Sequence, residues 1–285
     1  MELNMIVVTG ATGNVGRPLV RAMAEAGERV TAVSRGTAPV DLPSGAGHVR
    51  ADLTEPETLR PALDGAEALF LHDGGAGGHG LDPRAVLDVA KDAGVRRVVL
   101  LSSQGVVTRP ESPSHGGVMR AVEAAVRESG LAWTILRAGG FASNAYAWAE
   151  SVRAERTVAA PFGDVGIPVI DPADIAEVAA MALRKDEHTG ETYELNGPAA
   201  VTPRQQAEAI GAALGEPVRF VELTRAEAHA RMATFMPEPV VETTLAVLGE
   251  PNAAELRLSP DVERVLGRAP RPFAEWARRN VEAFR

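Results

Sequence analysis

The chain has 285 residues, no cysteine and a formal net charge of −9. This length allows one large core, or a main domain with a smaller lobe, while the lack of cysteine excludes disulfides, thiolate metal sites and cysteine nucleophiles. The acidic balance argues against binding to a nucleic-acid backbone, and no apolar run reaches the 18 residues of a membrane span. We therefore expect a cytoplasmic protein that binds neither nucleic acid nor membrane.

Short apolar runs alternate with helical patterns over the first 140 residues. Helix-length segments such as 16–26, 81–93 and 116–129 separate the runs, which are "MIVVTG", "RVTAVSR", "GHVRADL", "EALFLH", "RRVVLLSS" and "AWTILRA". This rhythm is typical of a parallel sheet with helices on both faces. We predict an α/β protein with a Rossmann-like, doubly wound parallel sheet in a domain over residues 1–186.

Helix signals dominate the rest of the chain. Asp171 before a proline is a capping carboxylate at a helix start, and Thr202 with Gln205 forms a capping box for a helix that ends at Gly215. Residues 273–284 carry one apolar stripe along a last helix. We predict a smaller, mostly helical C-terminal lobe over residues 187–285, packed closely on the first domain, with residues 150–167 contributing to it.

The segment "VVTGATGNVG" places three glycines between the first strand and the first helix. Such glycines allow a tight turn, close approach of backbone N–H groups to a pyrophosphate and close packing of helix on strand. The alternative is a glycine turn with a structural role alone. We predict a dinucleotide site in the turn, formed by Gly10, Ala11, Thr12, Gly13, Asn14, Val15 and Gly16.

The end of the second strand carries Ser34 and Arg35 where an NAD site usually has an acid. An arginine there pairs with a 2′-phosphate, so we expect NADP(H) in preference to NAD(H), unless Arg35 only points into solvent. Asp52 and Leu53, after the third strand, are suited to bracket the adenine, although Asp52 also suits a simple helix cap.

Polar residues follow two later strands. Ser102, Ser103 and Gln104 end the fifth strand, where open α/β sheets bind ligands, and their alternative role is to satisfy backbone groups. His72 and Asp73 begin the loop "HDGGAGGHG", which we interpret as an edge of the cofactor cleft. The loop has no rigid helical frame for a metal ion, so we expect neither metal nor flavin.

The chain resembles an atypical short-chain dehydrogenase/reductase of the NmrA-like group. The resemblance runs nearly end to end, through "VTGATGNVG", "ADL", "LLSSQG", "ESGLAWTILRAGGFASN", "VIDPADIAEVAAMAL", "GETYELNGP" and "VTPRQQAEAIGAALG". It implies that "LRAGGF" lies beside the nicotinamide, with Ala138 where a proline is common, followed by Gly139, Gly140 and Phe141. Such proteins include NADPH-dependent quinone and dye reductases, enzymes that tailor aromatic polyketides, and redox sensors.

Many enzymes with this glycine turn carry a catalytic Tyr and, four residues later, a Lys after the fifth strand. Here the corresponding pair is His115 and Met119, and no YxxxK occurs in the chain. His115 is our candidate catalytic proton donor and substrate contact, because an imidazole exchanges a proton near neutrality. Its alternative role is in a polar loop that caps the next helix.

A flat apolar pocket for an aromatic substrate is the expected use of several side chains from both parts of the chain. About half of such residues are expected to be core instead. The candidates, with Gln104 and His115, are Phe141, Asn144, Tyr146, Trp148, Met232, Phe235 and Met236.

The function predicted from these features is an NADPH-dependent reductase that transfers hydride directly to a quinone or polycyclic aromatic ketone. The alternative is a non-catalytic NAD(P)-binding sensor that acts through a protein partner. The lack of YxxxK favours the sensor, whereas the full C-terminal lobe and the candidate aromatic pocket favour the enzyme.

Overall fold

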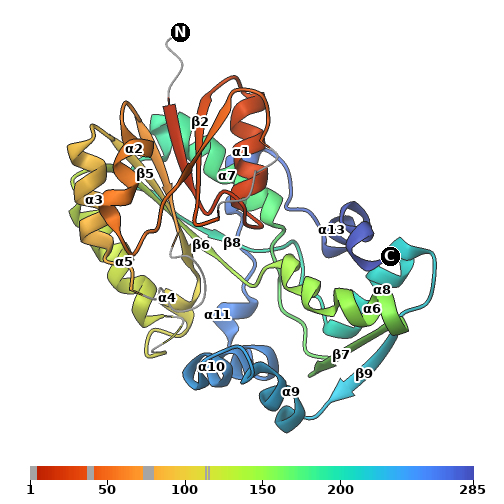
Figure 1. The fold of residues 1–285 in the computed structure, drawn as a ribbon. Helices are drawn as coiled ribbons and strands as arrows, with labels where there is room; N and C mark the ends of the chain where they lie inside the picture. The colour runs from red at the N-terminus through yellow and green to blue at the C-terminus, as the bar shows by residue number, and fades with distance from the viewer. Residues whose placement is uncertain (1–4, 37–41, 73–79, 113, 115) are drawn as a thin grey trace.

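A computed structural model describes residues 5–36, 42–72, 80–112, 114 and 116–285, and its centre is a seven-stranded sheet (Figure 1). The strand order is β3-β2-β1-β4-β5-β6-β8, and every neighbouring pair is parallel. This is the predicted Rossmann-like, doubly wound arrangement. The strands are β1 Met5–Thr9, β2 Arg29–Ser34, β3 Ala46–Arg50, β4 Ala68–Leu71, β5 Arg97–Ser103, β6 Ala132–Ala138 and β8 Thr192–Leu195.

Helices cover both faces of this sheet because its central strands are apolar on both sides. Ile6 and Val8 belong to the core beneath α1 (Gly16–Glu25) and α7 (Pro172–Arg184), and Val7 belongs to the core on the opposite face. The opposite face is covered by α3 Pro83–Asp92 and α5 Gly117–Glu128, with η1 Pro56–Leu59 and α2 Arg60–Leu63 at its edge. Alternate side chains of one strand thus serve two cores.

A second, smaller part has its own core and its own sheet. β7 (Thr157–Pro161) and β9 (Arg219–Leu223) pair in parallel, so β7, which falls within the predicted range 150–167, lies in this part. Its core contains Phe273, Trp276 and Phe284. The predicted boundary at residue 186 does not follow the sheets, because β8 comes after it and pairs with β6. The surrounding helices are η2 Ala142–Trp148, α6 Ala149–Glu155, α8 Pro203–Leu214, α13 Phe273–Arg279 and η4 Val281–Phe284.

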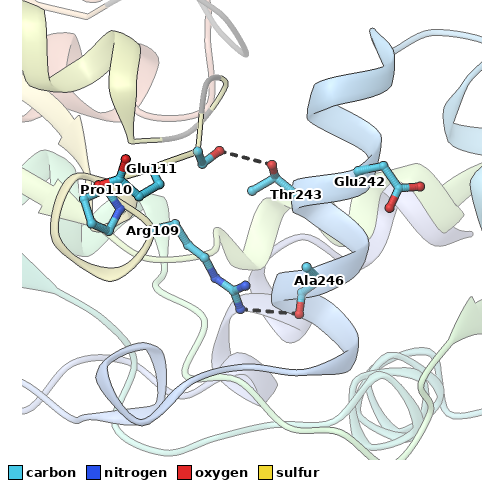
Figure 2. Close-up of a pocket in the computed structure, with 7 residues that line it drawn as sticks. Arg109, Pro110, Glu111, Glu242, Thr243 and Ala246 are labelled. Carbon is cyan, nitrogen blue, oxygen red and sulfur yellow. Dashed lines mark hydrogen bonds between the residues drawn. The ribbon is translucent and has the colours of Figure 1, made fainter.

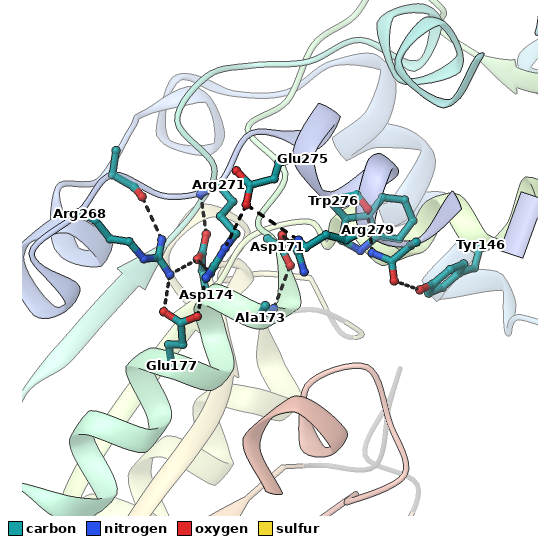
Figure 3. Close-up of polar contacts among 12 residues, drawn as sticks. Tyr146, Asp171, Ala173, Asp174, Glu177, Arg268, Arg271, Glu275, Trp276 and Arg279 are labelled. Atoms are coloured by element: carbon teal, nitrogen blue, oxygen red, sulfur yellow. Dashed lines mark hydrogen bonds and ion pairs between the residues drawn. The ribbon is translucent and has the colours of Figure 1, made fainter. Parts of the chain in front are cut away.

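Ion pairs join the end of the chain to the start of α7 (Figure 3). Asp174 on α7 is fully buried and pairs with Arg268 (2.7 Å) and with Arg271. Arg279 on α13 pairs with Asp171, which caps α7. A buried carboxylate needs cationic partners, and these ion pairs hold the C-terminal segment of the smaller part against α7 of the first part.

The predicted helix ends are confirmed, with one correction. Asp171 accepts the N–H of Ala173, the capping box of Thr202 and Gln205 is complete, and the helix they start ends at Gly215 in a left-handed conformation. The predicted single last helix is wrong, because it stops at Asn280 and continues as η4. The Asn280 amide donates to the carbonyl of Trp276 (2.8 Å), and such local side-chain bonds compete with helix continuation.

Helices α4, α9, α10 and α11 lie below the sheet in Figure 1, whereas α12 and η3 pack against α7. Arg109, just after α4, donates two hydrogen bonds (2.8 and 2.9 Å) to the buried carboxylate of Glu255 on α11. No helix in the described ranges has the length and apolar character of a membrane span. The helices not yet given bounds are α4 Gly105–Thr108, η3 Asp186–His188, α9 Arg225–Met232, α10 Glu238–Gly249, α11 Ala253–Leu256 and α12 Asp261–Leu266.

Candidate active site

The glycine turn between β1 and α1 is closely packed. Gly10 has a left-handed φ of 60°, and a Cβ built on it would lie 1.8 Å from Nε2 of His72. A Cβ on Gly16 would lie 2.2 Å from the Gly10 carbonyl oxygen, and the Gly13 N–H donates to that oxygen (2.9 Å). Two of the three predicted roles, the tight turn and the close helix packing, are therefore present.

The start of α1 fits the pyrophosphate of a dinucleotide. No hydrogen bond within the described residues uses the backbone N–H of Asn14, Val15 or Gly16, and the first turn of α1 contains no acid. Unused N–H groups at the positive end of a helix dipole bind anions. The predicted residues 10–16 thus form a suitable cradle, and His72, predicted as a cofactor contact, lies against it.

The ends of β2 and β3 form the expected adenosine side of the site. Ser34 Oγ and His48 Nε2 are 2.9 Å apart, so the serine hydroxyl already has a protein partner. Arg35 is exposed, and its carbonyl accepts a hydrogen bond from Nε of Arg50 (3.1 Å). His48 and Arg50 were not among the predicted site residues, although both lie in the run "GHVRADL", which was predicted to be a strand.

Asp52 does not cap the next helix, whose N-cap is Glu55. Its carboxylate accepts the N–H of Thr54 (3.0 Å) and the Thr54 hydroxyl (2.9 Å). These hydrogen bonds, and to a smaller extent the charge of Arg35, hold the pKa of Asp52 below its ordinary value. Leu53 is half-buried and packs against the core under α2 and α3.

The serines at the end of β5 have protein partners. Ser102 donates to the buried carboxylate of Glu123 (2.7 Å), and Ser103 accepts the N–H of Gly105 (3.0 Å). The contact of Ser103 corresponds to the backbone role left open for these residues, whereas Ser102 binds a side chain. Gln104 lies differently, because a Cβ on Gly139 would be 3.2 Å from its Oε1. The structure thus places Gln104 beside the segment expected near the nicotinamide.

Glu123 is the centre of a buried polar network that the sequence interpretation missed. Its side chain is 1% exposed and binds Arg137 through two hydrogen bonds (2.9 and 2.7 Å) and Arg127 through one (3.0 Å). Burial pushes its pKa up, but the hydrogen bonds from Arg137 and Ser102 outweigh burial and hold the pKa below its ordinary value. The network fixes the ends of β5 and β6 behind the site.

The segment after β6 touches the glycine turn. The Gly140 carbonyl accepts the N–H of Ile170 (2.8 Å), which fixes the chain between β6 and η2. Asn14 of the turn donates through its amide to Ser143 (3.1 Å). Ala138 is buried and Phe141 is half-buried in this segment. The structure therefore brings the predicted cofactor residues of β1 and β6 together.

The predicted aromatic pocket is divided between two clusters. Tyr146 donates to Asn280 (2.6 Å) and packs against Trp276 and Phe284, with ring centroids 5.0 and 6.2 Å away, and Trp148 packs in the same core. Met232 and Met236 instead pack with Phe162 in a small cluster of the α9–α10 pair. Two further candidates are exposed, namely Asn144 and Phe235, the latter by 68%.

A cavity of about 460 Å³ lies between the segment after α4 and α10 (Figure 2). Ser112 on one wall is 3.1 Å from the Thr243 hydroxyl on the other. The sequence interpretation did not foresee this cavity, since its walls come from segments more than 100 residues apart. It is lined by Arg109, Pro110, Glu111, Ser112, Glu242, Thr243 and Ala246.

Two predicted site residues, Asp73 and His115, lie outside the described residues. Within the described ranges, one group has metal-ligating side chains within reach of one another: His229, Glu238 and Glu242. His229 Nε2 is 2.9 Å from Glu238, and Arg225 pairs with Glu242 (2.8 Å). We interpret this surface group as a set of ion pairs.

Comparisons with known proteins identify the family of the chain. The profile of the NAD(P)H-binding family matches residues 10–186. A (4-alkanoyl-5-oxo-2,5-dihydrofuran-3-yl)methyl phosphate reductase of Streptomyces griseus is 36% identical over 98% of this chain and 99% of the relative. An NAD(P)H azoreductase of Xenophilus azovorans is 34% identical over 98% of this chain and 99% of the relative.

Solved structures show the same fold. The NADPH-dependent quinone oxidoreductase QOR2 of Escherichia coli superposes with a TM-score of 0.75 at 25% identity, covering 96% of this chain and 98% of the other. The negative transcriptional regulator NmrA superposes with a TM-score of 0.73 at 18% identity, covering 99% and 96%. The chain belongs to the NAD(P)H-binding family, is an NAD(P)H-dependent oxidoreductase, and has a fold that it shares with NmrA.

Proposed function

We propose that the protein uses NADPH to reduce a quinone or a polycyclic aromatic ketone by direct hydride transfer. The observation that carries this proposal is the position of its two tyrosines. The Tyr193 hydroxyl is buried against Nδ1 of His188 (2.8 Å), and the Tyr146 hydroxyl donates to Asn280 (2.6 Å). Neither phenol is therefore available as the proton donor of a reacting carbonyl.

Their surroundings also work against acid catalysis. Burial raises the pKa of Tyr146 and of Tyr193 above the ordinary value, and nearby carboxylates such as Asp171 and Glu191 add to the effect. A catalytic phenol needs the opposite, a pKa lowered toward neutrality. Without such a group the reaction lacks a contribution of about 10²–10⁴-fold in rate.

This loss restricts the substrate more than it restricts the reaction. Orientation of donor and acceptor supplies about 7–11 kcal/mol without any proton donor. An acceptor whose oxygen becomes a phenolate, with a pKa of about 10, needs far less proton donation than one that becomes a simple alkoxide. Quinones and polyhydroxylated aromatic ketones are acceptors of this kind.

The residues that would hold the cofactor are those of the glycine turn, with Arg35 and the segment after β6. NADPH supplies the hydride when bound. The unused N–H groups of Asn14, Val15 and Gly16 would bind the pyrophosphate, and Gln104 beside Gly139 would orient the acceptor by a hydrogen bond. The positions of these residues at the carboxyl edge of the sheet support the proposed roles.

The named relatives support an acceptor that stabilises its own charge. The compound named for the Streptomyces relative has a ring double bond conjugated with both an alkanoyl and an oxo group, so hydride addition yields a delocalised enolate. Quinones and azo compounds, named for two other relatives, are likewise conjugated electrophiles. We transfer to this chain the class of acceptor, a conjugated electrophile, and within it we favour the quinone.

The test is NADPH oxidation, followed by absorbance, with naphthoquinones, anthraquinones, an azo dye, an acyl butenolide and a simple cyclohexanone. We expect turnover with the quinones and none with cyclohexanone, since only the former stabilise the product anion. Transfer of deuterium from 4-deuterated NADPH to the product checks the direct route. Tight NADPH binding without oxidation by any acceptor would refute the reductase and favour the sensor. Preferred turnover of cyclohexanone would contradict the conclusion that the site lacks a catalytic phenol.

We further propose that His115 compensates in part for the missing phenol, as a hydrogen-bond donor or proton relay to the acceptor oxygen. The variant His115→Ala is expected to lower kcat about 10–100-fold for a quinone while leaving the Kd of NADPH unchanged. His229→Ala is the matched control, because His229 is a half-exposed histidine of α9 in a surface ion-pair group. Equal kcat values for the two variants would remove His115 from the mechanism.

A further inference from the structure

Arg50 lies at the same edge of the sheet as Arg35 because β2 and β3 are parallel. Strand pairing places Arg50 directly opposite Ser34, the residue before Arg35. Nε of Arg50 donates to the carbonyl of Arg35 (3.1 Å), which holds the Arg50 side chain against the end of β2. This is the end at which an arginine faces the 2′-phosphate of a bound NADP(H).

Neither arginine has a carboxylate partner among the described residues. Both are exposed, and the acid that follows β3, Asp52, is held by two hydrogen bonds from Thr54 instead. Other arginines of this acidic chain, such as Arg137, are neutralised by ion pairs. Asp52 is near enough for the charge of Arg35 to lower its pKa, but among the described residues neither arginine is in an ion pair. Two cationic side chains at one edge without such a pair favour an anion there.

We propose that Arg50 is a specificity-determining residue that binds the 2′-phosphate of NADP(H) together with Arg35. The proposal rests on the NADP(H) preference in the proposed function. One nitrogen of the Arg50 guanidinium is bound to the Arg35 carbonyl, which leaves the two terminal nitrogens for phosphate oxygens. The side chain is therefore oriented before the cofactor arrives, and a lysine, with one nitrogen, does not reproduce both contacts.

The experiment measures the Kd of NADPH, NADH, 2′,5′-ADP and 5′-ADP by calorimetry for the intact chain. We expect Arg50→Leu to weaken NADPH and 2′,5′-ADP about 10–100-fold, while NADH and 5′-ADP change less than about twofold. Arg50→Lys is expected to fall between wild type and Arg50→Leu. Arg50→Gln, which keeps a donor for the Arg35 carbonyl but no charge, gives the same loss and serves if the leucine variant does not fold.

Arg29→Leu is the matched control. Arg29 is an exposed arginine at the opposite end of β2, paired in register with Met5, and its removal changes the net charge equally. We expect no ligand to change more than about twofold. An unchanged ratio of NADPH to NADH affinity in Arg50→Leu or Arg50→Gln, or a wild-type protein without preference for NADPH, overturns the proposal.

These binding measurements require no turnover. A protein that binds NADPH through Arg50 but oxidises it with no acceptor would refute the reductase and keep this inference. A protein that reduces quinones, but whose Arg50→Leu variant retains the wild-type ratio of NADPH to NADH affinity, would keep the reductase and refute this inference.

Discussion

The imidazole of His72 occupies the space where any side chain on Gly10 would begin: a Cβ there would lie 1.8 Å from Nε2. Gly10 also has a φ of 60°, which only glycine adopts readily. We expect Gly10→Ala to weaken NADPH binding more than about 100-fold, because His72 and the turn must both move. Isothermal titration checks this value.

Two companion variants separate the causes at Gly10. Gly94 also has a positive φ, 94°, but a Cβ built on it meets no atom within 4 Å. Gly94→Ala therefore measures the cost of the backbone conformation alone, about 1 kcal/mol in the free energy of unfolding. Adding His72→Ala to Gly10→Ala removes the clash and is expected to restore part of the thermal stability. No restoration in the double variant would show that the backbone conformation alone excludes alanine.

Arg35→Ala is expected to weaken NADPH about 10–100-fold, since a charge-assisted hydrogen bond contributes about 1.5–3 kcal/mol. NADH lacks the 2′-phosphate and is expected to bind nearly as in the wild type. Fluorescence titration with both cofactors measures the two constants. Equal weakening of both would mean that Arg35 supports the fold of the strand end rather than the phosphate.

Glu123→Gln leaves Arg137 without its anionic partner in a site that is nearly sealed from water. We expect the free energy of unfolding at pH 7 to fall by about 3–5 kcal/mol, the usual cost of breaking a buried pair. Urea denaturation measures it. Glu128→Gln on the same helix removes an exposed partner of Arg84 and is expected to cost less than about 1 kcal/mol.

The same pair has a defined pH dependence. The folded state lowers the pKa of Glu123 below 4.5, because hydrogen bonds from Arg137 and Ser102 outweigh the opposing effect of burial. The stabilisation is therefore complete above about pH 4.5 and is lost as the pH falls through the lower, folded value. We expect wild type and Glu123→Gln to converge in unfolding free energy below pH 4.5. A constant difference down to pH 3 would contradict this assignment.

Tyr146→Phe tests which role this residue has. Its hydroxyl is already bound to Asn280 and its ring is packed against Trp276, so we expect a loss of about 1 kcal/mol in stability and no change in kcat/KM for quinones. Thermal denaturation and steady-state kinetics measure the two effects. A drop in kcat/KM of more than tenfold would return Tyr146 to the substrate site predicted from the sequence.

Features that depend on residues close together in the chain could be predicted from the amino-acid sequence. Alternating apolar runs and helices specified the parallel sheet, because a strand buried on both faces must be apolar at every position. The glycine turn around Gly10 and the cap at Asp171 were also readable, since both depend on local backbone geometry. The end of the last helix was not, because Asn280 stops it with a side-chain bond that periodicity does not reveal.

Which side chains are available for ligands depends on contacts between residues that are distant in the chain. Ser102 and Tyr146 have the chemistry of binding residues, but Glu123 and Asn280 occupy their hydroxyls from 21 and 134 residues away. Arg50 gained its position in the same way, through the register of β3 on β2. Strand register and packing bring together residues that are distant in the chain, so composition and spacing locate the binding edge while tertiary contacts select the groups that face it.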